Sequence, residues 1–241
     1  MSPDSPQRPK LTTLVLVPGL LCDQTLWAHQ TRFLAPLVEC LVPDITRHDS
    51  IEGLAQAVLA QAPAHFALAG LSLGGIIAHA IMAIAPERVT QLALVATTAR
   101  PDTAEQTARR QRLIGLAQQG DFDEIPRALL PTLLHPARVA DPELERTVMA
   151  MAKAVGATAF IRQITAVMHR PDRRSQLAHY RVPTLVLCGR EDAITPLVMA
   201  EEMAAAIPGS KLAILEECGH LATLERPQAV TALLRHWLLY G

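Results

Sequence analysis

The sequence lacks the features that mark nucleic-acid-binding, membrane-spanning and disulfide-bonded proteins. Its 22 Lys and Arg residues are scattered among 23 Asp and Glu residues, and the formal net charge is −1. A chain without a basic stripe has no electrostatic footprint for nucleic acid. No apolar run reaches the roughly 18 residues that a membrane-spanning helix needs. We therefore expect a soluble protein with neither nucleic acid nor a membrane as its partner.

Cysteines and the motifs of metal and cofactor sites are also scarce. The four cysteines lie far apart and form no C-x-x-C pair: Cys22, Cys40, Cys188 and Cys218. A chain of this length folds without disulfides, so we expect reduced thiols with packing roles. The sequence contains no H-E-x-x-H, no P-loop, no G-x-G-x-x-G after a strand and no Cys/His cluster. We therefore expect no cofactor and no metal ion.

The first ten residues, Met1 to Lys10, are polar and contain three prolines. They lack the apolar stretch of a secretory signal. We expect this leader, residues 1–10, to be disordered and the protein to be cytoplasmic.

The rest of the chain has the pattern of an α/β protein. Short apolar runs alternate with longer helix-like segments, which is typical of a mostly parallel sheet with helices on both faces. Six strands are predicted: Thr12 to Val17, Glu39 to Pro43, Phe66 to Leu71, Gln91 to Ala96, Thr184 to Cys188 and Lys211 to Leu215. Helices are predicted at Trp27 to Leu37, Ile51 to Ala62, Gly74 to Ala85, Pro196 to Ala206 and Pro227 to Leu239.

The alternation stops between Arg100 and Arg181, where the pattern is helical throughout and no strand is predicted. Breaks are expected at Gly120, Pro126, Pro131, Pro136, Pro142 and Pro171. We interpret residues 100–181 as an inserted helical cap on a core formed by residues 11–99 and 182–241. An insertion after the carboxyl end of a strand lies where open α/β sheets bind ligands, so this segment is expected to cover a pocket.

The motif Gly70-Leu71-Ser72-Leu73-Gly74 follows a predicted strand and precedes a predicted helix. This is G-x-S-x-G in the context that a nucleophile elbow requires. The flanking glycines allow the backbone to turn sharply and to expose the serine hydroxyl above the sheet. Ser72 is therefore the candidate nucleophile, and a simple tight turn is the alternative.

A serine hydroxyl needs a base that takes its proton and a carboxylate that orients the base. His220 follows the last predicted strand in Cys218-Gly219-His220 and is the candidate base; the other eight histidines occupy less suitable positions. Asp192, in the loop after the strand that ends at Cys188, is the candidate acid. Its neighbour Glu191 is expected to be solvated, and Asp102 is the alternative position for the acid.

Acyl transfer also requires hydrogen-bond donors for the oxyanion that develops in the transition state. The backbone N–H of Leu73, at the start of the helix after Ser72, suits this role. The second donor is expected in the loop after the first strand, where we choose the backbone N–H of Leu20 next to Gly19.

These motifs, in this order and with a cap between them, resemble the α/β-hydrolase superfamily over nearly the whole chain. The chain is similar to carboxylesterases of the pimeloyl-ACP methyl ester esterase type and to 3-oxoadipate enol-lactonases. The resemblance implies an α/β-hydrolase fold and a site made of Ser72, Asp192, His220, Leu73 and Leu20. Two departures are Pro18, where the family often has His, and a leader too short for the family's first two strands.

The function expected from these residues is hydrolysis of a small carboxylic ester through an acyl-enzyme on Ser72. The same triad serves enol-lactone, thioester and C–C bond hydrolases, and a non-catalytic ligand-binding protein or a perhydrolase remains possible. We expect the partner to be a small ester-like molecule and the protein to be a monomer or a homodimer. Apolar cap residues are candidates for the pocket lining: Leu113, Ile114, Leu133, Leu134, Val148, Met149, Met151, Phe160 and Ile161.

Overall fold

A computed structural model describes residues 13–241, so the leader predicted for residues 1–10 lies outside the described residues. Six strands form one sheet in the order β2-β1-β3-β4-β5-β6, and every neighbouring pair is parallel. The strands are β1 (Thr13–Val17), β2 (Glu39–Leu41), β3 (Phe66–Leu71), β4 (Val89–Val95), β5 (Thr184–Gly189) and β6 (Lys211–Leu215). The predicted fold class is confirmed, and all six strands lie where the apolar runs predict them.

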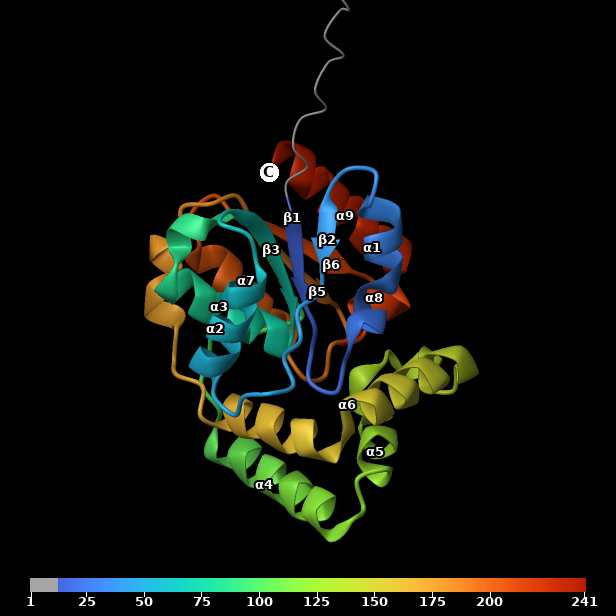
Figure 1. Ribbon diagram of the computed structural model, residues 1–241. Helices are drawn as coiled ribbons and strands as arrows, with labels where there is room; N and C mark the ends of the chain where they lie inside the picture. The colour runs from blue at the N-terminus through green and yellow to red at the C-terminus, as the bar shows by residue number, and fades with distance from the viewer. Residues whose placement is uncertain (1–12) are drawn as a thin grey trace, which may run out of the picture.

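Helices cover both faces of this sheet (Figure 1). One face packs against α2 (Ile51–Gln61), α3 (Leu73–Ile84) and α7 (Leu197–Ala206), and the other against α1 (Ala28–Leu34), α8 (Ala222–Glu225) and α9 (Pro227–Tyr240). Every residue of β3 and β5 is buried. Burial on both faces explains why these strands are continuous apolar runs rather than alternating ones.

Three further helices fill the segment between β4 and β5: α4 (Ala104–Gln119), α5 (Glu124–Leu133) and α6 (Pro142–Met168). They lie beyond the carboxyl ends of the strands (Figure 1). Their buried side chains form a small apolar cluster that includes Leu21 from the loop after β1, together with Phe122, Phe160 and Ile164. We call residues 100–181 the cap segment; its treatment as a unit separate from the core stays a prediction.

Two of the expected breaks in the cap segment are wrong. Pro126 and Pro131 both lie inside α5. Pro126 occupies the first turn, where a backbone N–H has no partner within the helix, so the ring costs little there. The real interruption comes at Gly156, whose φ of 76° and ψ of 165° kink α6. Glycine adopts this left-handed region without the steric penalty of a side chain.

The structure also bears on two expected absences. All four cysteines are free thiols. Within residues 13–241, no helix is both long and apolar enough to cross a membrane.

Candidate active site

The turn at Ser72 joins β3 to α3 and has an unusual backbone. Ser72 has φ of 56° and ψ of −112°, a conformation that a non-glycine residue adopts only when its surroundings enforce it. A Cβ atom on Gly70 would lie 2.2 Å from the Gly74 carbonyl oxygen, and one on Gly74 would lie 2.1 Å from the Val17 carbonyl oxygen. The two glycines therefore allow the close backbone packing that holds Ser72 in the turn.

His220 and Asp192 form a buried pair. His220 Nδ1 lies 2.8 Å from Asp192 Oδ2, although the residues are 28 positions apart in the chain. Only 2% of His220 and 4% of Asp192 are exposed. The Thr195 hydroxyl donates to Asp192 Oδ2 at 2.7 Å, and the backbone N–H groups of Ile194 and Thr195 donate to Oδ1. The carboxylate is thus fixed in position and directed at the imidazole.

The same contacts set the protonation state of Asp192. Burial by itself raises the pKa of this carboxyl, but the charge and hydrogen bond of His220 and the donors of Thr195 outweigh it. The pKa of Asp192 therefore lies below its ordinary value, and the carboxylate stays ionised at neutral pH. An ionised partner at Nδ1 favours the tautomer of His220 that leaves Nε2 available as a base.

Ser72 and His220 line one cavity of about 210 Å³ at the carboxyl ends of the strands. No hydrogen bond joins the two side chains in the part of the chain that the structure describes. Such contacts are often long in unliganded enzymes and shorten when substrate binds. The structure therefore brings Ser72, His220 and Asp192 to one site without showing the serine already paired with its base.

The predicted oxyanion donors, Leu20 and Leu73, line the same cavity. Leu73 is the first residue of α3, so its N–H has no acceptor within the helix. Neither N–H donates to another backbone group between residues 13 and 241. Both donors are therefore available to a ligand.

The loop that carries Leu20 is held by a residue that the sequence analysis missed. Gln163 of α6 is fully buried; its Oε1 accepts the N–H of Leu21 at 3.2 Å, and its Nε2 donates to the Ile45 carbonyl at 3.3 Å. Leu21 itself has a positive φ of 61°. A glutamine inside a helix gives no sign of this role in the sequence, because both of its partners come from distant loops.

The other two acidic candidates have different surroundings. Both carboxylate oxygens of Asp102 are engaged, one with Arg170 and the other with Arg110 Nε at 3.0 Å. Asp102 therefore does not face His220 as an alternative acid. Glu191 is half-buried rather than fully solvated, because it accepts the backbone N–H of Cys218 at 3.0 Å.

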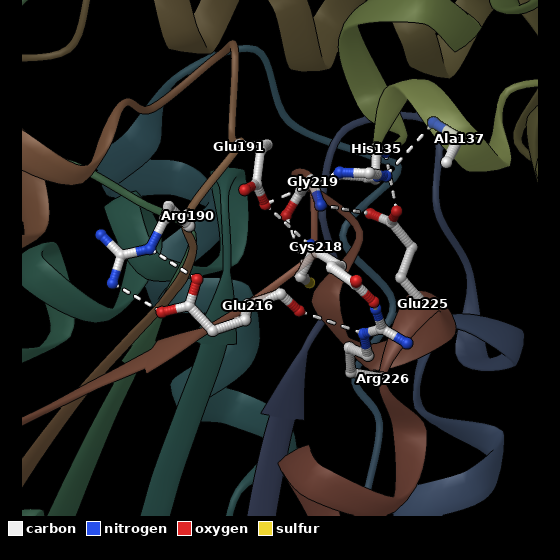
Figure 2. A network of polar contacts seen from close by, with 10 residues as sticks. His135, Ala137, Arg190, Glu191, Glu216, Cys218, Gly219, Glu225 and Arg226 are labelled. Carbon is white, nitrogen blue, oxygen red and sulfur yellow. Dashed lines mark hydrogen bonds and ion pairs between the residues drawn. The ribbon is translucent and has the colours of Figure 1, made fainter.

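A buried carboxylate links the His220 loop to the cap segment, as Figure 2 shows. Glu225 of α8 is 2% exposed and accepts two backbone N–H groups, from His135 at 2.7 Å and from Gly219 at 3.0 Å. Burial raises the pKa of Glu225, and the two N–H donors partly offset this. The N–H of His220 also donates to the Leu133 carbonyl at 3.0 Å. The backbone of the candidate base is therefore hydrogen-bonded to the end of α5. No sequence pattern predicts this contact.

The cavity wall is largely apolar near the candidate nucleophile. Of the nine cap residues expected to line it, Leu113, Leu133 and Val148 do so. The others do not: Ile114, Leu134, Met149, Met151, Phe160 and Ile161. Several of them are buried between the cap helices, as helical packing requires.

Comparison with known sequences agrees with the fold. Residues 14–233 match the alpha/beta hydrolase family, and the chain belongs to that family. Among curated relatives, it is 30% identical over 194 residues to a pimeloyl-[acyl-carrier protein] methyl ester esterase of Neisseria meningitidis, covering 78% of this chain and 75% of that protein. It is 25% identical to the protein of the same name from Aromatoleum aromaticum, covering 92% and 96% of the two chains.

Solved structures show the same fold. A thermophilic esterase from Thermogutta terrifontis, described as malate bound, superposes with a TM-score of 0.86 and 28% identity, over 94% of this chain and 89% of that one. The enol-lactonase from Burkholderia xenovorans superposes with a TM-score of 0.85 and 23% identity, over 98% and 94% of the two chains. The second likeness shows the fold alone. The resemblance to α/β-hydrolases that the motifs carry is thus confirmed.

Proposed function

We propose that this protein hydrolyses small carboxylic esters through an acyl-enzyme on Ser72. The observation that carries the proposal is the buried His220–Asp192 pair, at 2.8 Å, opening into the cavity that Ser72 lines. Membership of a hydrolase family that includes esterases supports it. Enol-lactones contain an ester bond, so their hydrolysis by the same groups is included in the proposal.

In the proposed reaction, Ser72 Oγ attacks the ester carbonyl carbon while His220 Nε2 takes the hydroxyl proton. The N–H groups of Leu73 and Leu20 donate to the oxyanion of the tetrahedral intermediate. Collapse of the intermediate breaks the bond to the alcohol, which leaves with the proton from His220. Water then attacks the acyl-enzyme, His220 takes its proton and returns one to Ser72, and the carboxylic acid departs. Asp192 orients the imidazole and stabilises its charged form throughout.

The proposal is tested with p-nitrophenyl esters of graded acyl length. We expect Ser72→Ala to lower kcat/KM by at least about 10³-fold, because the acyl-enzyme is no longer formed. Ser175→Ala is the matched control, since Ser175 is exposed and lies away from the cavity. Hydrolysis that survives in Ser72→Ala at the wild-type rate would overturn the proposal.

A further inference from the structure

One part of the cavity wall is cationic. Arg109 and Arg110 of α4 and Arg170 after α6 line the cavity together with Ser72 and His220. No Asp or Glu residue of the described chain lines it. Three arginines and no acidic residue of the described chain therefore border a space whose other lining residues are mainly apolar.

Asp102, which pairs with two of these arginines, does not neutralise their combined positive charge. Asp102 is shared between Arg110 and Arg170, so one negative charge serves two guanidinium groups. Arg109 is exposed and makes no ion pair with any side chain between residues 13 and 241. The cavity wall therefore carries an excess of positive charge, which Coulomb attraction makes favourable for an anion.

These arginines also have hydrogen-bond donors to spare. The Arg170 side chain is 4% exposed, and it donates from Nε to the Arg100 carbonyl and from Nη1 to Asp102 and the Val167 carbonyl. Its Nη2 makes no hydrogen bond within residues 13–241, and Arg110 uses only Nε. A guanidinium fork with available donors matches the two oxygens of a carboxylate.

Burial increases the effect of the excess charge. The pKa of Arg170 is lowered, first by burial and also by the charge of Arg110, although Asp102 acts in the opposite direction. A buried cation near a second cation is stabilised when an anion binds beside it.

We propose that Arg109, Arg110 and Arg170 bind a carboxylate of the substrate, so that the preferred substrate is an ester that also carries a free carboxylate group. This inference rests on the proposed esterase function and assigns its substrate class. The apolar wall, which includes Leu113, Leu129 and Val148, accommodates the aliphatic chain between the carboxylate and the ester. Arg109 is the most accessible of the three, and its removal leaves the Asp102 ion pairs intact.

The test compares charged and neutral esters of equal length. One arm uses monomethyl esters of dicarboxylic acids from succinate to suberate, with the carboxylate on the acyl side, against the dimethyl esters. The other arm uses acetate esters of ω-hydroxy acids, with the carboxylate on the alcohol side, against their methyl esters. We expect kcat/KM to be higher for the charged ester than for the neutral ester in one of the two arms. That arm then shows whether the preferred carboxylate lies on the acyl side or on the alcohol side of the ester.

Variants identify the residues responsible. We expect Arg109→Gln to lower the charged-to-neutral ratio of kcat/KM by about tenfold, mainly through KM, as for loss of one charge-assisted hydrogen bond. Arg112→Gln removes the same charge from an exposed position of α4 that does not line the cavity, and the ratio should stay at the wild-type value. The ratio of the wild-type protein should also fall as salt concentration rises.

The outcomes separate this inference from the proposed function. Hydrolysis of neutral esters without preference for the charged ones, or an equal effect of the two variants, would overturn the inference and leave the esterase proposal standing. Calorimetric binding of the monomethyl esters to Ser72→Ala, compared with Ser72→Ala/Arg109→Gln, provides the second readout. Arg109-dependent binding, combined with a wild-type protein that hydrolyses none of the esters, would support the carboxylate site and overturn the proposed function.

Discussion

At the scale of single residues, the contacts of Asp192 show how a buried carboxylate acquires a defined role. Three donors from residues 194–195 and the imidazole of His220 occupy its two oxygens. Burial opposes ionisation of this group, and the hydrogen bonds and the charge of His220 together outweigh burial. The result is a fixed negative charge next to the candidate base.

Asp192→Asn should lower kcat by about 10²-fold to 10⁴-fold with a smaller change in KM, because the amide neither stabilises the imidazolium nor selects its tautomer. Steady-state kinetics on the best p-nitrophenyl ester measures the change. Asp49→Asn, at an exposed position remote from the cavity, serves as the control. A kcat within threefold of wild type, a margin of about 0.7 kcal/mol, would contradict the role of Asp192.

The pKa of Asp192 also gives a prediction for stability. Because its pKa in the folded protein lies below the ordinary 3.8, ionised Asp192 stabilises the folded state above that pH. This contribution is lost as pH falls through the lowered pKa. The difference in the free energy of unfolding between wild type and Asp192→Asn should therefore shrink as the pH falls below about 4. Urea titrations above and below this pH measure it, and a difference that grows on acidification would contradict the assignment.

At the scale of elements, Glu225 connects three pieces of the protein: α8, the His220 loop and the end of α5 (Figure 2). Its carboxylate satisfies two backbone N–H groups that would otherwise be buried without an acceptor. An unsatisfied buried donor costs about 1–3 kcal/mol. The contact therefore holds the backbone that carries His220 and connects it to the cap segment.

Glu225→Ala should lower the free energy of unfolding by about 2–4 kcal/mol and reduce kcat more than it raises KM. The backbone N–H groups of His135 and Gly219 lose their acceptor in this variant. The loop that carries His220 is then held less firmly. Glu217→Ala, at an exposed ion pair of the same loop, should change stability by less than about 1 kcal/mol. Urea unfolding with parallel kinetics measures both variants, and equal effects would contradict the role of Glu225.

At the scale of the whole molecule, the close approach of α3 to β1 determines how the turn at Ser72 packs on the sheet. A Cβ atom on Gly74 would meet backbone atoms of Val17 and Pro18, which have no room to move away inside a packed core. By contrast, a Cβ atom on Gly115 of α4 would meet nothing within 4 Å. Close packing therefore requires glycine at position 74, whereas nothing near position 115 excludes a side chain.

Gly74→Ala should destabilise the protein by more than about 3 kcal/mol or prevent folding, because backbone atoms of two elements would overlap with the new methyl group. Gly115→Ala should instead stabilise it by about 0.5–1 kcal/mol through helix propensity. Thermal unfolding monitored by circular dichroism measures both changes. A neutral Gly74→Ala variant would show that α3 can move away from β1 without loss of stability.

The fold class, the positions of the six strands and the G-x-S-x-G motif could be predicted from the sequence. These features depend on local patterns: apolar runs that are buried on both faces, and glycines at fixed distances from Ser72. His220 and Asp192 could also be proposed from the sequence, because each follows a strand that the same pattern predicts. Chain order and strand ends therefore sufficed to select Ser72 and His220, which line one cavity, and Asp192, which the structure pairs with His220.

The surroundings of those residues could not be predicted from the sequence. Gln163 reaches Leu21 across 142 positions, and Glu225 reaches His135 across 90. Asp102, a possible acid by its position, instead pairs with arginines, one of them 68 positions away. Sequence patterns report the periodicity of burial within an element, whereas the partner of a polar side chain depends on which distant elements folding brings beside it. The cationic wall of the cavity is visible only in three dimensions for the same reason.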